Sequence, residues 1–214
     1  MSVGLRIGGI VAQLFQIHPS HPQRRLVDDA VGLLRTDGVL ALPTDASYVL
    51  ACRIENANGH ERIRRIRQLD AQHLFSLLCS DFSQISQFAQ MDNECFRLLK
   101  NLLPAPYTVV LRGSKNLGRR LLHPKRRTVG IRMPKHPVLL AILEALGEPL
   151  IATTLELPKA TEPLSYAQDI REALQHQIDA VIDCGETRLS ETTILDMTQS
   201  PYAVLRQGIA PAPW

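Results

Sequence analysis

Apolar residues recur along this chain with two different periods, which separates the expected strands from the expected helices. Short runs rich in Val, Ile and Leu predict strands at 14–17, 39–42, 48–52, 74–78, 107–111, 128–132, 150–153, 180–182, 192–195 and 203–205. Apolar residues three or four positions apart predict helices at 23–35, 81–90, 92–103, 137–146 and 166–176. A further helix is predicted to begin after an N-terminal cap at Asn58. Because these strands and helices alternate irregularly along the chain, we expect an α/β protein with a mixed, strongly twisted sheet rather than a doubly wound fold.

Length and composition fit a chain with one core. The 214 residues are 45% hydrophobic, which is enough to bury a core of ordinary size. No segment resembles a linker, a repeat or an apolar run of membrane-spanning length. We therefore expect a single domain at 11–214, preceded by an extension at 1–10, and no membrane partner.

Cysteine and histidine spacings give no sign of a disulfide framework or a metal site. The four cysteines are far apart, without a C-x-x-C pair, and the histidines form no H-E-x-x-H motif. This pattern is typical of reduced thiols in a cytoplasmic protein. We expect no structural metal and no intrinsic cofactor, so that magnesium would enter only with a nucleotide.

The stretch at 37–52 places polar residues at a corner between two buried strands. Pro43 fixes its own backbone angle, and the side chains of Thr44 and Asp45 can bond either to the nearby backbone or to a bound ligand. Both interpretations stay open at this point, because spacing alone supports each of them equally.

Positive charge is concentrated between residues 112 and 135. This segment has nine basic residues and no acidic one: Arg112, Lys115, Arg119, Arg120, Lys125, Arg126, Arg127, Arg132 and Lys135. Subtracting these nine charges from the net +3 of the chain leaves −6 elsewhere. The arginines at 62–67 form a second block. Such a field attracts the phosphates of a nucleotide or a nucleic acid, although a solvated loop is the alternative.

Several short motifs, in order along the chain, resemble the YrdC/YciO family, which includes the threonylcarbamoyl-AMP synthases. They are Pro-Thr-Asp-Ala-Ser-Tyr at 43–48, Pro-Ala-Pro-Tyr-Thr at 104–108, Thr-Val-Gly-Ile-Arg-Met-Pro at 128–134, Leu-Ile-Ala-Thr-Thr at 150–154 and Leu-Arg-Gln-Gly at 205–208. The resemblance extends over roughly residues 12 to 209. It implies the family's twisted α/β sandwich with a basic concave face.

The resemblance also implies a reaction and the residues that serve it. The family's synthases join threonine, bicarbonate and ATP into threonylcarbamoyl-adenylate, release pyrophosphate, and serve transfer RNA modification. Thr44 and Tyr48 would line the amino-acid end, Arg67 would begin the Lys-x-Arg motif, and Thr108 would lie between amino acid and nucleotide. The nucleotide would be contacted by Arg132, Thr154 and Arg206. The chemistry consists mainly of positioning and charge neutralisation.

Three positions depart from the synthase pattern and resemble the YciO branch. Leu69 replaces the arginine of Lys-x-Arg, Glu156 replaces the asparagine of Ser-x-Asn, and His73 replaces a lysine. Loss of a bidentate donor and gain of a carboxylate weaken phosphate binding. The main hypothesis is therefore a protein that binds nucleotide and double-stranded RNA, with at most weak synthase activity.

The RNA or phosphate contacts would come from the two basic blocks, at Arg64, Arg65, Arg119, Arg120, Lys125, Arg126 and Arg127. A double helix is expected because no aromatic ladder for single strands is present. An active synthase that uses ATP with magnesium in transfer RNA modification is the alternative hypothesis. An adaptor without a small ligand is the third.

Overall fold

The computed structural model describes residues 11–70, 73–118, 121–123, 125–158 and 164–214. Its described helices are α1 (Arg24–Arg35), α2 (Ala57–Arg67), α3 (Phe82–Phe88), α4 (Asn93–Leu102), α5 (Pro137–Leu146) and α6 (Ala167–Leu174). Its described strands are β1 (Gln13–Gln16), β2 (Leu40–Leu42), β3 (Val49–Arg53), β4 (Ser76–Leu78), β5 (Ala89–Gln90), β6 (Tyr107–Gly113), β7 (Thr128–Arg132), β8 (Leu150–Thr154), β9 (Ala180–Asp183), β10 (Thr193–Asp196) and β11 (Ala203–Arg206).

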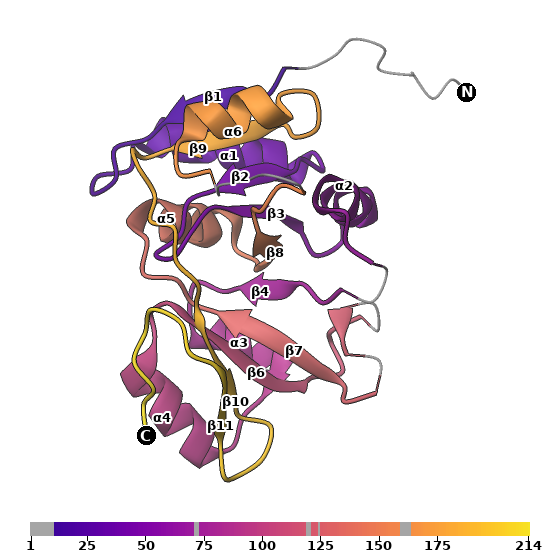
Figure 1. Ribbon diagram of the computed structural model, residues 1–214, viewed down its shortest axis with the longest axis vertical. Helices are drawn as coiled ribbons and strands as arrows, with labels where there is room; N and C mark the ends of the chain where they lie inside the picture. The colour runs from indigo at the N-terminus through magenta and orange to yellow at the C-terminus, as the bar shows by residue number, and fades with distance from the viewer. Residues whose placement is uncertain (1–10, 71–72, 119–120, 124, 159–163) are drawn as a thin grey trace.

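The strands form one mixed sheet, as the sequence predicted. Their order is β1-β9-β2-β3-β8-β4-β7-β6-β10-β11, and β5 pairs with β6. The sheet contains parallel pairs, such as β4 with β7, and antiparallel pairs, such as β3 with β8. The sheet follows the long axis of the molecule, with β1 and β9 at one end and β10 and β11 at the other (Figure 1).

Helices cover both faces of the sheet. Leu40 and Leu42 of β2 pack into a cluster with residues of α1 and α5, while Ala41 belongs to a second cluster that includes residues of α2 and α6. This alternation follows from the two-residue period of a strand, and it leaves all of β2 buried. The predicted packing of the 23–35 helix on this sheet is therefore confirmed.

Two local predictions were wrong. Asn56, not Asn58, caps α2: its Oδ1 accepts a hydrogen bond from the Gly59 N–H at 2.7 Å, and Asn58 lies inside the helix. Gly59 permits this because a Cβ there would collide with the Asn56 side chain. The expected helix at 81–90 ends at Phe88, since Ala89 is extended and pairs with Gly113 of β6.

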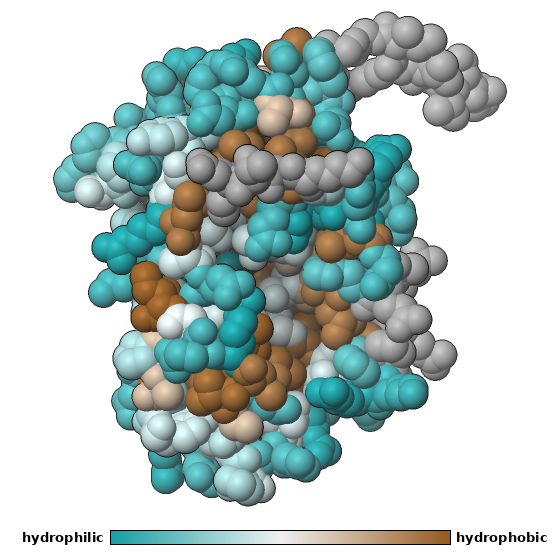
Figure 2. All heavy atoms as spheres, in the orientation of Figure 1, coloured by the Kyte–Doolittle hydropathy of each residue, from teal (hydrophilic) through white to brown (hydrophobic). Residues whose placement is uncertain are grey.

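The distribution of apolar surface differs along the molecule. On the face of Figure 2, apolar patches gather around the middle, whereas the two ends are mostly hydrophilic. Among the residues that the structure describes, no helix has both the length and the apolar character needed to cross a bilayer. Exposed apolar side chains on this face therefore lie mainly around the middle of the molecule.

Candidate functional site

The corner between β2 and β3 is closed by the hydroxyl of Thr44. This oxygen accepts hydrogen bonds from the N–H groups of Ala46 and Ser47, each at 3.1 Å, and donates to the Ser47 carbonyl at 2.7 Å. Thr44 is buried, and its bonds are those of a side chain that satisfies a turn. The geometry thus supports the turn interpretation for Thr44 and gives the corner one fixed shape.

Asp45 holds a buried arginine at the end of β7. Nη2 of Arg132 lies 3.2 Å from Oδ1 of Asp45 and 3.1 Å from Oγ1 of Thr44. The other carboxylate oxygen of Asp45 accepts from the Lys135 N–H at 2.9 Å. The Arg132 and Asp45 side chains are only 7% and 10% exposed. Burial lowers the pKa of Arg132, while the charge of Asp45 opposes that shift.

Arg132 borders two adjoining hollows, of about 260 and 200 Å³, which we call the arginine cavity. Both hollows are also lined by Thr154, Thr192 and Arg206. The first hollow is completed by Ala46, Ser47, Leu155, Glu156, Leu189, Ser190 and Glu191, and the second by Val49, His73, Leu74, Ser76, Thr108, Ala152, Thr153 and Ile194. Ends of β6, β7, β8 and β10 therefore meet at one site.

Hydroxyl groups line much of the second hollow. Oγ1 of Thr108 lies 2.7 Å from Oγ1 of Thr192, because parallel pairing sets β10 beside β6. Oγ1 of Thr153 lies 3.2 Å from Nε2 of His73. Burial, together with the nearby charge of Arg67, lowers the pKa of His73 and favours its neutral form. The wall thus presents neutral donors and acceptors beside a cationic end.

Arg206 enters the cavity from β11 and is held by residues next to β10. Its Nη1 pairs with Oε1 of Glu191 at 2.9 Å, and its Nη2 donates to the Thr192 carbonyl at 3.0 Å. Gly208 allows this approach, because a Cβ there would collide with the backbone of Glu191 and Thr192. The ion pair with Glu191 and the bond to the Thr192 carbonyl hold the guanidinium of Arg206 at the cavity wall.

Arg67, at the C-terminal end of α2, is bound to a residue of the cavity wall. Its Nη2 pairs with Oε2 of Glu156 at 2.8 Å, and its Nη1 contacts the carbonyl oxygen of the same residue. The Arg67 side chain is 11% exposed. Two of the departures from the synthase motifs are thus related in space. Glu156 binds both terminal nitrogens of Arg67, and Leu69 lies two residues after that arginine.

The predicted ligand-binding residues fall into two groups. Thr108, Arg132, Thr154 and Arg206 line the arginine cavity, and Thr44 supports Arg132 from behind. Tyr48 does not line it: its side chain is 1% exposed, and its hydroxyl donates to the Ile182 carbonyl at 2.9 Å. Burial raises the pKa of that hydroxyl. Tyr48 therefore anchors β3 to β9 in the core.

Sequence reasoning missed the segment that precedes β10. Ser190, Glu191 and Thr192 all line the cavity, although they were not proposed as site residues. Their signal was the polar pair at 190–191 immediately before the strand predicted at 192–195, whose first residue is Thr192. Such residues often mark ligand sites at strand ends, but the strand order was needed to place this segment beside Thr108.

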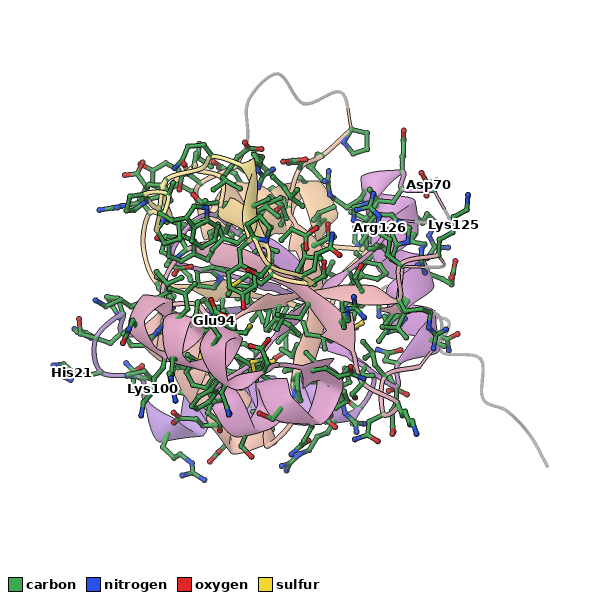
Figure 3. The ribbon with its side chains drawn as sticks, turned by 90° about the horizontal axis from the view of Figure 1, so that it is seen from below. His21, Asp70, Glu94, Lys100, Lys125 and Arg126 are labelled. Carbon is green, nitrogen blue, oxygen red and sulfur yellow. The ribbon has the colours of Figure 1, made fainter. Side chains whose placement is uncertain are left out.

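The residues predicted to bind RNA are only partly exposed. Arg65 on α2 and the three residues at 125–127 are exposed, and we call these four cations the basic edge. Lys125 and Arg126 lie on the same side of the molecule as Asp70, which follows α2 (Figures 1 and 3). Arg119 and Arg120 lie outside the described residues.

Arg64 belongs to neither the exposed group nor the cavity wall. Its guanidinium carbon lies 4.8 Å from the centre of the Phe75 ring, and its Nη1 pairs with Oε1 of Glu61 at 3.3 Å. The side chain is 14% exposed. A guanidinium stacked on an aromatic ring in this way packs α2 against the chain segment before β4.

Within the described part of the chain, no three His, Cys, Asp or Glu side chains are grouped as metal ligands would be. The candidate site is instead an arrangement of arginines, carboxylates and hydroxyls. Such groups can bind an oxyanion and orient a small polar molecule without a resident metal.

Fold and site together define a mixed α/β protein with an arginine- and hydroxyl-lined cavity at its strand ends. The chain belongs to the Sua5/YciO/YrdC family, because the model of that family, which is described as telomere recombination, matches residues 32–208. It is 44% identical to YciO of Escherichia coli K12, over 93% of this chain and 97% of that protein. The crystal structure of E. coli YciO superposes with a TM-score of 0.88, over 94% of this chain and 97% of that one.

A more distant relative has a named activity. The threonylcarbamoyl-AMP synthase of Pyrococcus abyssi is 30% identical, over 85% of this chain and 54% of that protein. The structure of P. abyssi Sua5 in complex with L-threonine is 27% identical and superposes with a TM-score of 0.82, over 91% of this chain and 57% of that one. This chain therefore spans about half the length of those relatives.

Proposed function

We propose that the arginine cavity binds a nucleotide through a phosphate held between Arg132 and Arg206. The observation that carries this proposal is the Nε of Arg132, which is buried and has no hydrogen-bond partner among the described residues. Arg132 lines both hollows. Buried donors are normally satisfied, and a phosphate oxygen forms strong, charge-assisted bonds with guanidinium groups.

We propose further that the hydroxyl-lined hollow receives a small amino acid. Thr108, Thr153 and Thr192 supply neutral donors and acceptors there, which suit a polar side chain or an amino group. The structure of P. abyssi Sua5 with L-threonine supports a threonine-sized ligand, since that protein shares the fold. The two ligands would then meet near Arg132.

Synthesis of threonylcarbamoyl-AMP by this protein is proposed to be weak. Leu69 offers no donor, and both terminal nitrogens of Arg67 are bound to Glu156 rather than open to a phosphate. Charge neutralisation as pyrophosphate leaves is the main contribution that such a site makes. Each missing charged hydrogen bond removes roughly 1.5–3 kcal/mol of that stabilisation.

Thermal unfolding tests the nucleotide site, because a ligand that binds the folded state raises the melting temperature. The melting temperature is measured without nucleotide, with AMP, and with ATP and magnesium. Arg206→Gln should remove the shift, since it deletes one of the two cavity cations. Arg112→Gln is the matched control: that arginine also donates to a backbone carbonyl, of Thr198 at 3.2 Å, but it does not line the cavity. No shift for the unaltered protein with either nucleotide would contradict the proposal.

The similarity to the P. abyssi synthase favours a second candidate, an active synthase in transfer RNA modification. Pyrophosphate release that depends on threonine and bicarbonate separates the two candidates. Turnover comparable to that of an authentic synthase would support the second. Release that stays at background at high protein concentration would support the first.

Double-stranded RNA is the macromolecular partner that we propose for the basic edge. Its four cations are exposed, and Lys125 and Arg126 lie on the side of the molecule where Asp70 follows α2, the helix that carries Arg65 (Figure 3). Exposed cations of this kind can contact the phosphates of a nucleic-acid backbone. A duplex RNA titration at several salt concentrations tests this. Affinity that falls steeply with salt, and falls further when Arg126 and Arg127 are replaced by Gln, would support the proposal. Affinity that is absent at low salt would contradict it.

A further inference from the structure

Negative charge balances the positive charge of the arginine cavity. The two arginines in its wall are paired with carboxylates, Arg132 with Asp45 at 3.2 Å and Arg206 with Glu191 at 2.9 Å. Arg67 at its margin is paired with Glu156 at 2.8 Å. Glu156 and Glu191 themselves line the first hollow. The cavity therefore has cationic groups for a phosphate but little excess positive charge.

The two wall carboxylates differ in what they compensate. Glu191 pairs with an arginine whose side chain is 40% exposed, so that water screens both charges. Glu156 pairs with Arg67, which is only 11% exposed and whose Nη1 also contacts the carbonyl of Glu156. The backbone contact would keep the guanidinium in place if the carboxylate lost its charge. Glu156 is thus the group that neutralises a well-positioned buried cation.

We propose that Glu156 determines specificity, so that the cavity accepts a nucleoside monophosphate and rejects a nucleoside triphosphate. The inference rests on the proposed nucleotide site. A monophosphate needs only the guanidinium groups of Arg132 and Arg206. A triphosphate brings about twice the negative charge, and its extra phosphates would meet the Glu156 carboxylate while both terminal nitrogens of Arg67 are already bound to Glu156. An acyl adenylate, which keeps one phosphate, would fit by the same reasoning.

Calorimetric titration of AMP and of ATP into the whole protein, with magnesium added in parallel ATP runs, measures this preference. We expect AMP to bind at least about tenfold more tightly than ATP. Glu156→Gln should strengthen ATP binding by about tenfold, the usual effect of one gained hydrogen bond to a charged group, and should change AMP binding much less. Glu156 is 54% exposed, so the variant should fold.

Two further variants make the test specific. Glu148→Gln is the matched control, because Glu148 is also a half-buried partner of an arginine, Arg53, but does not line the cavity. It should bind both nucleotides as the unaltered protein does. Adding Arg67→Gln to Glu156→Gln should cancel the gain in ATP affinity, because the freed guanidinium is the group that produces it.

The outcomes separate this inference from the proposed function. ATP binding as tight as AMP binding in the unaltered protein, or an unchanged ratio in Glu156→Gln, would overturn the inference and leave the nucleotide site intact. Binding of neither nucleotide would overturn the proposed function and the inference with it. An equal gain in ATP affinity from Glu148→Gln would show a general charge effect and would overturn the role of Glu156.

Discussion

The arginine cavity and the basic edge use the same kind of residue in opposite ways. In the cavity, Arg132, Arg206 and the adjoining Arg67 each have a carboxylate partner within 3.2 Å. On the basic edge, Arg65 and residues 125–127 have no carboxylate within 4.0 Å among the described residues. In the first set, the side chains of Arg132 and Arg67 are only 7% and 11% exposed, while that of Arg206 is 40% exposed. The second set is exposed.

The contrast follows from the cost of removing a charge from water. A buried guanidinium requires a nearby countercharge, whereas an exposed one is stabilised by solvent and needs none. Altering a cavity cation should therefore change both folding stability and ligand binding. Altering the basic edge should change only interactions with other charged molecules, and those changes should depend on salt.

The largest expected effect comes from breaking the buried pair. Arg132→Met leaves the Asp45 carboxylate buried without its partner, which costs about 3–5 kcal/mol of unfolding free energy. Urea denaturation measures the loss. Arg112→Met, at an exposed position, is the control and should cost much less. Adding Asp45→Asn to Arg132→Met should recover part of the loss, and a loss below about 1 kcal/mol for Arg132→Met alone would contradict the comparison.

The second-largest effect on stability is expected from a close backbone contact at the cavity wall. In Gly208→Ala the new Cβ would collide with the backbone of Glu191 and Thr192, so that the wall must move. We expect a loss of about 1–3 kcal/mol in stability, together with weaker nucleotide binding. Gly32→Ala is the matched control: a Cβ there meets nothing within 4 Å, and α1 should gain about 0.5–1 kcal/mol. Equal stability of the two variants would show that the close approach is unimportant.

Acid should lower the stability of the folded protein through three histidines, of which His73 lines the arginine cavity. Burial lowers the pKa of His73 below its ordinary 6.5, and burial also lowers the pKa values of His60 and His136. The unfolded chain therefore binds protons first as the pH falls, and stability declines below about pH 6.5 towards the lower folded pKa values. Urea midpoints measured from pH 7.5 to 5 follow this decline.

His73→Gln should flatten that pH profile because it removes one of the titrating groups. Replacement of the basic edge should leave the profile unchanged. If the profile of the unaltered protein were flat, or rose as the pH fell, the sign of the histidine shifts would be wrong.

The smallest effect on stability is expected at the basic edge. Replacement of Lys125, Arg126 and Arg127 by Gln should change the unfolding free energy by less than about 0.5 kcal/mol, because these side chains form no ion pair with the described residues. The salt dependence of duplex RNA binding should fall by nearly one unit for each phosphate contact removed. Arg24→Gln with Arg25→Gln on α1 is the control for exposed arginines elsewhere. Equal effects of the two sets on RNA binding would contradict a localised edge.

Much of the fold could be read from hydrophobic periodicity, because strands and helices bury apolar residues at different intervals. The ends of α5 were predicted correctly, since Pro137 begins the helix and Gly147 adopts the left-handed conformation that ends it. The cap of α2 and the short strand β5 were missed. Both involve contacts outside the local pattern. Asn56, which caps α2, also donates from Nδ2 to the Asp37 carbonyl at 2.8 Å, and β5 forms only by pairing with β6.

The candidate site was predicted less completely. Motif resemblance indicated Thr108, Arg132, Thr154 and Arg206, which line the cavity. It also indicated Tyr48, whose side chain faces the core, because a strand alternates its faces and the motif does not say which residue points where.

The sequence by itself determined the kinds of element, the family motifs and the segregation of positive charge, because these depend on residue identity and short-range spacing. The tertiary structure decided which charges meet. Glu191 reaches Arg206, and Glu156 reaches Arg67 across 89 residues, through the order of the strands and the position of α2. Electrostatic interactions act through distance in space, so the balance of charge in the cavity became visible only when the chain was folded.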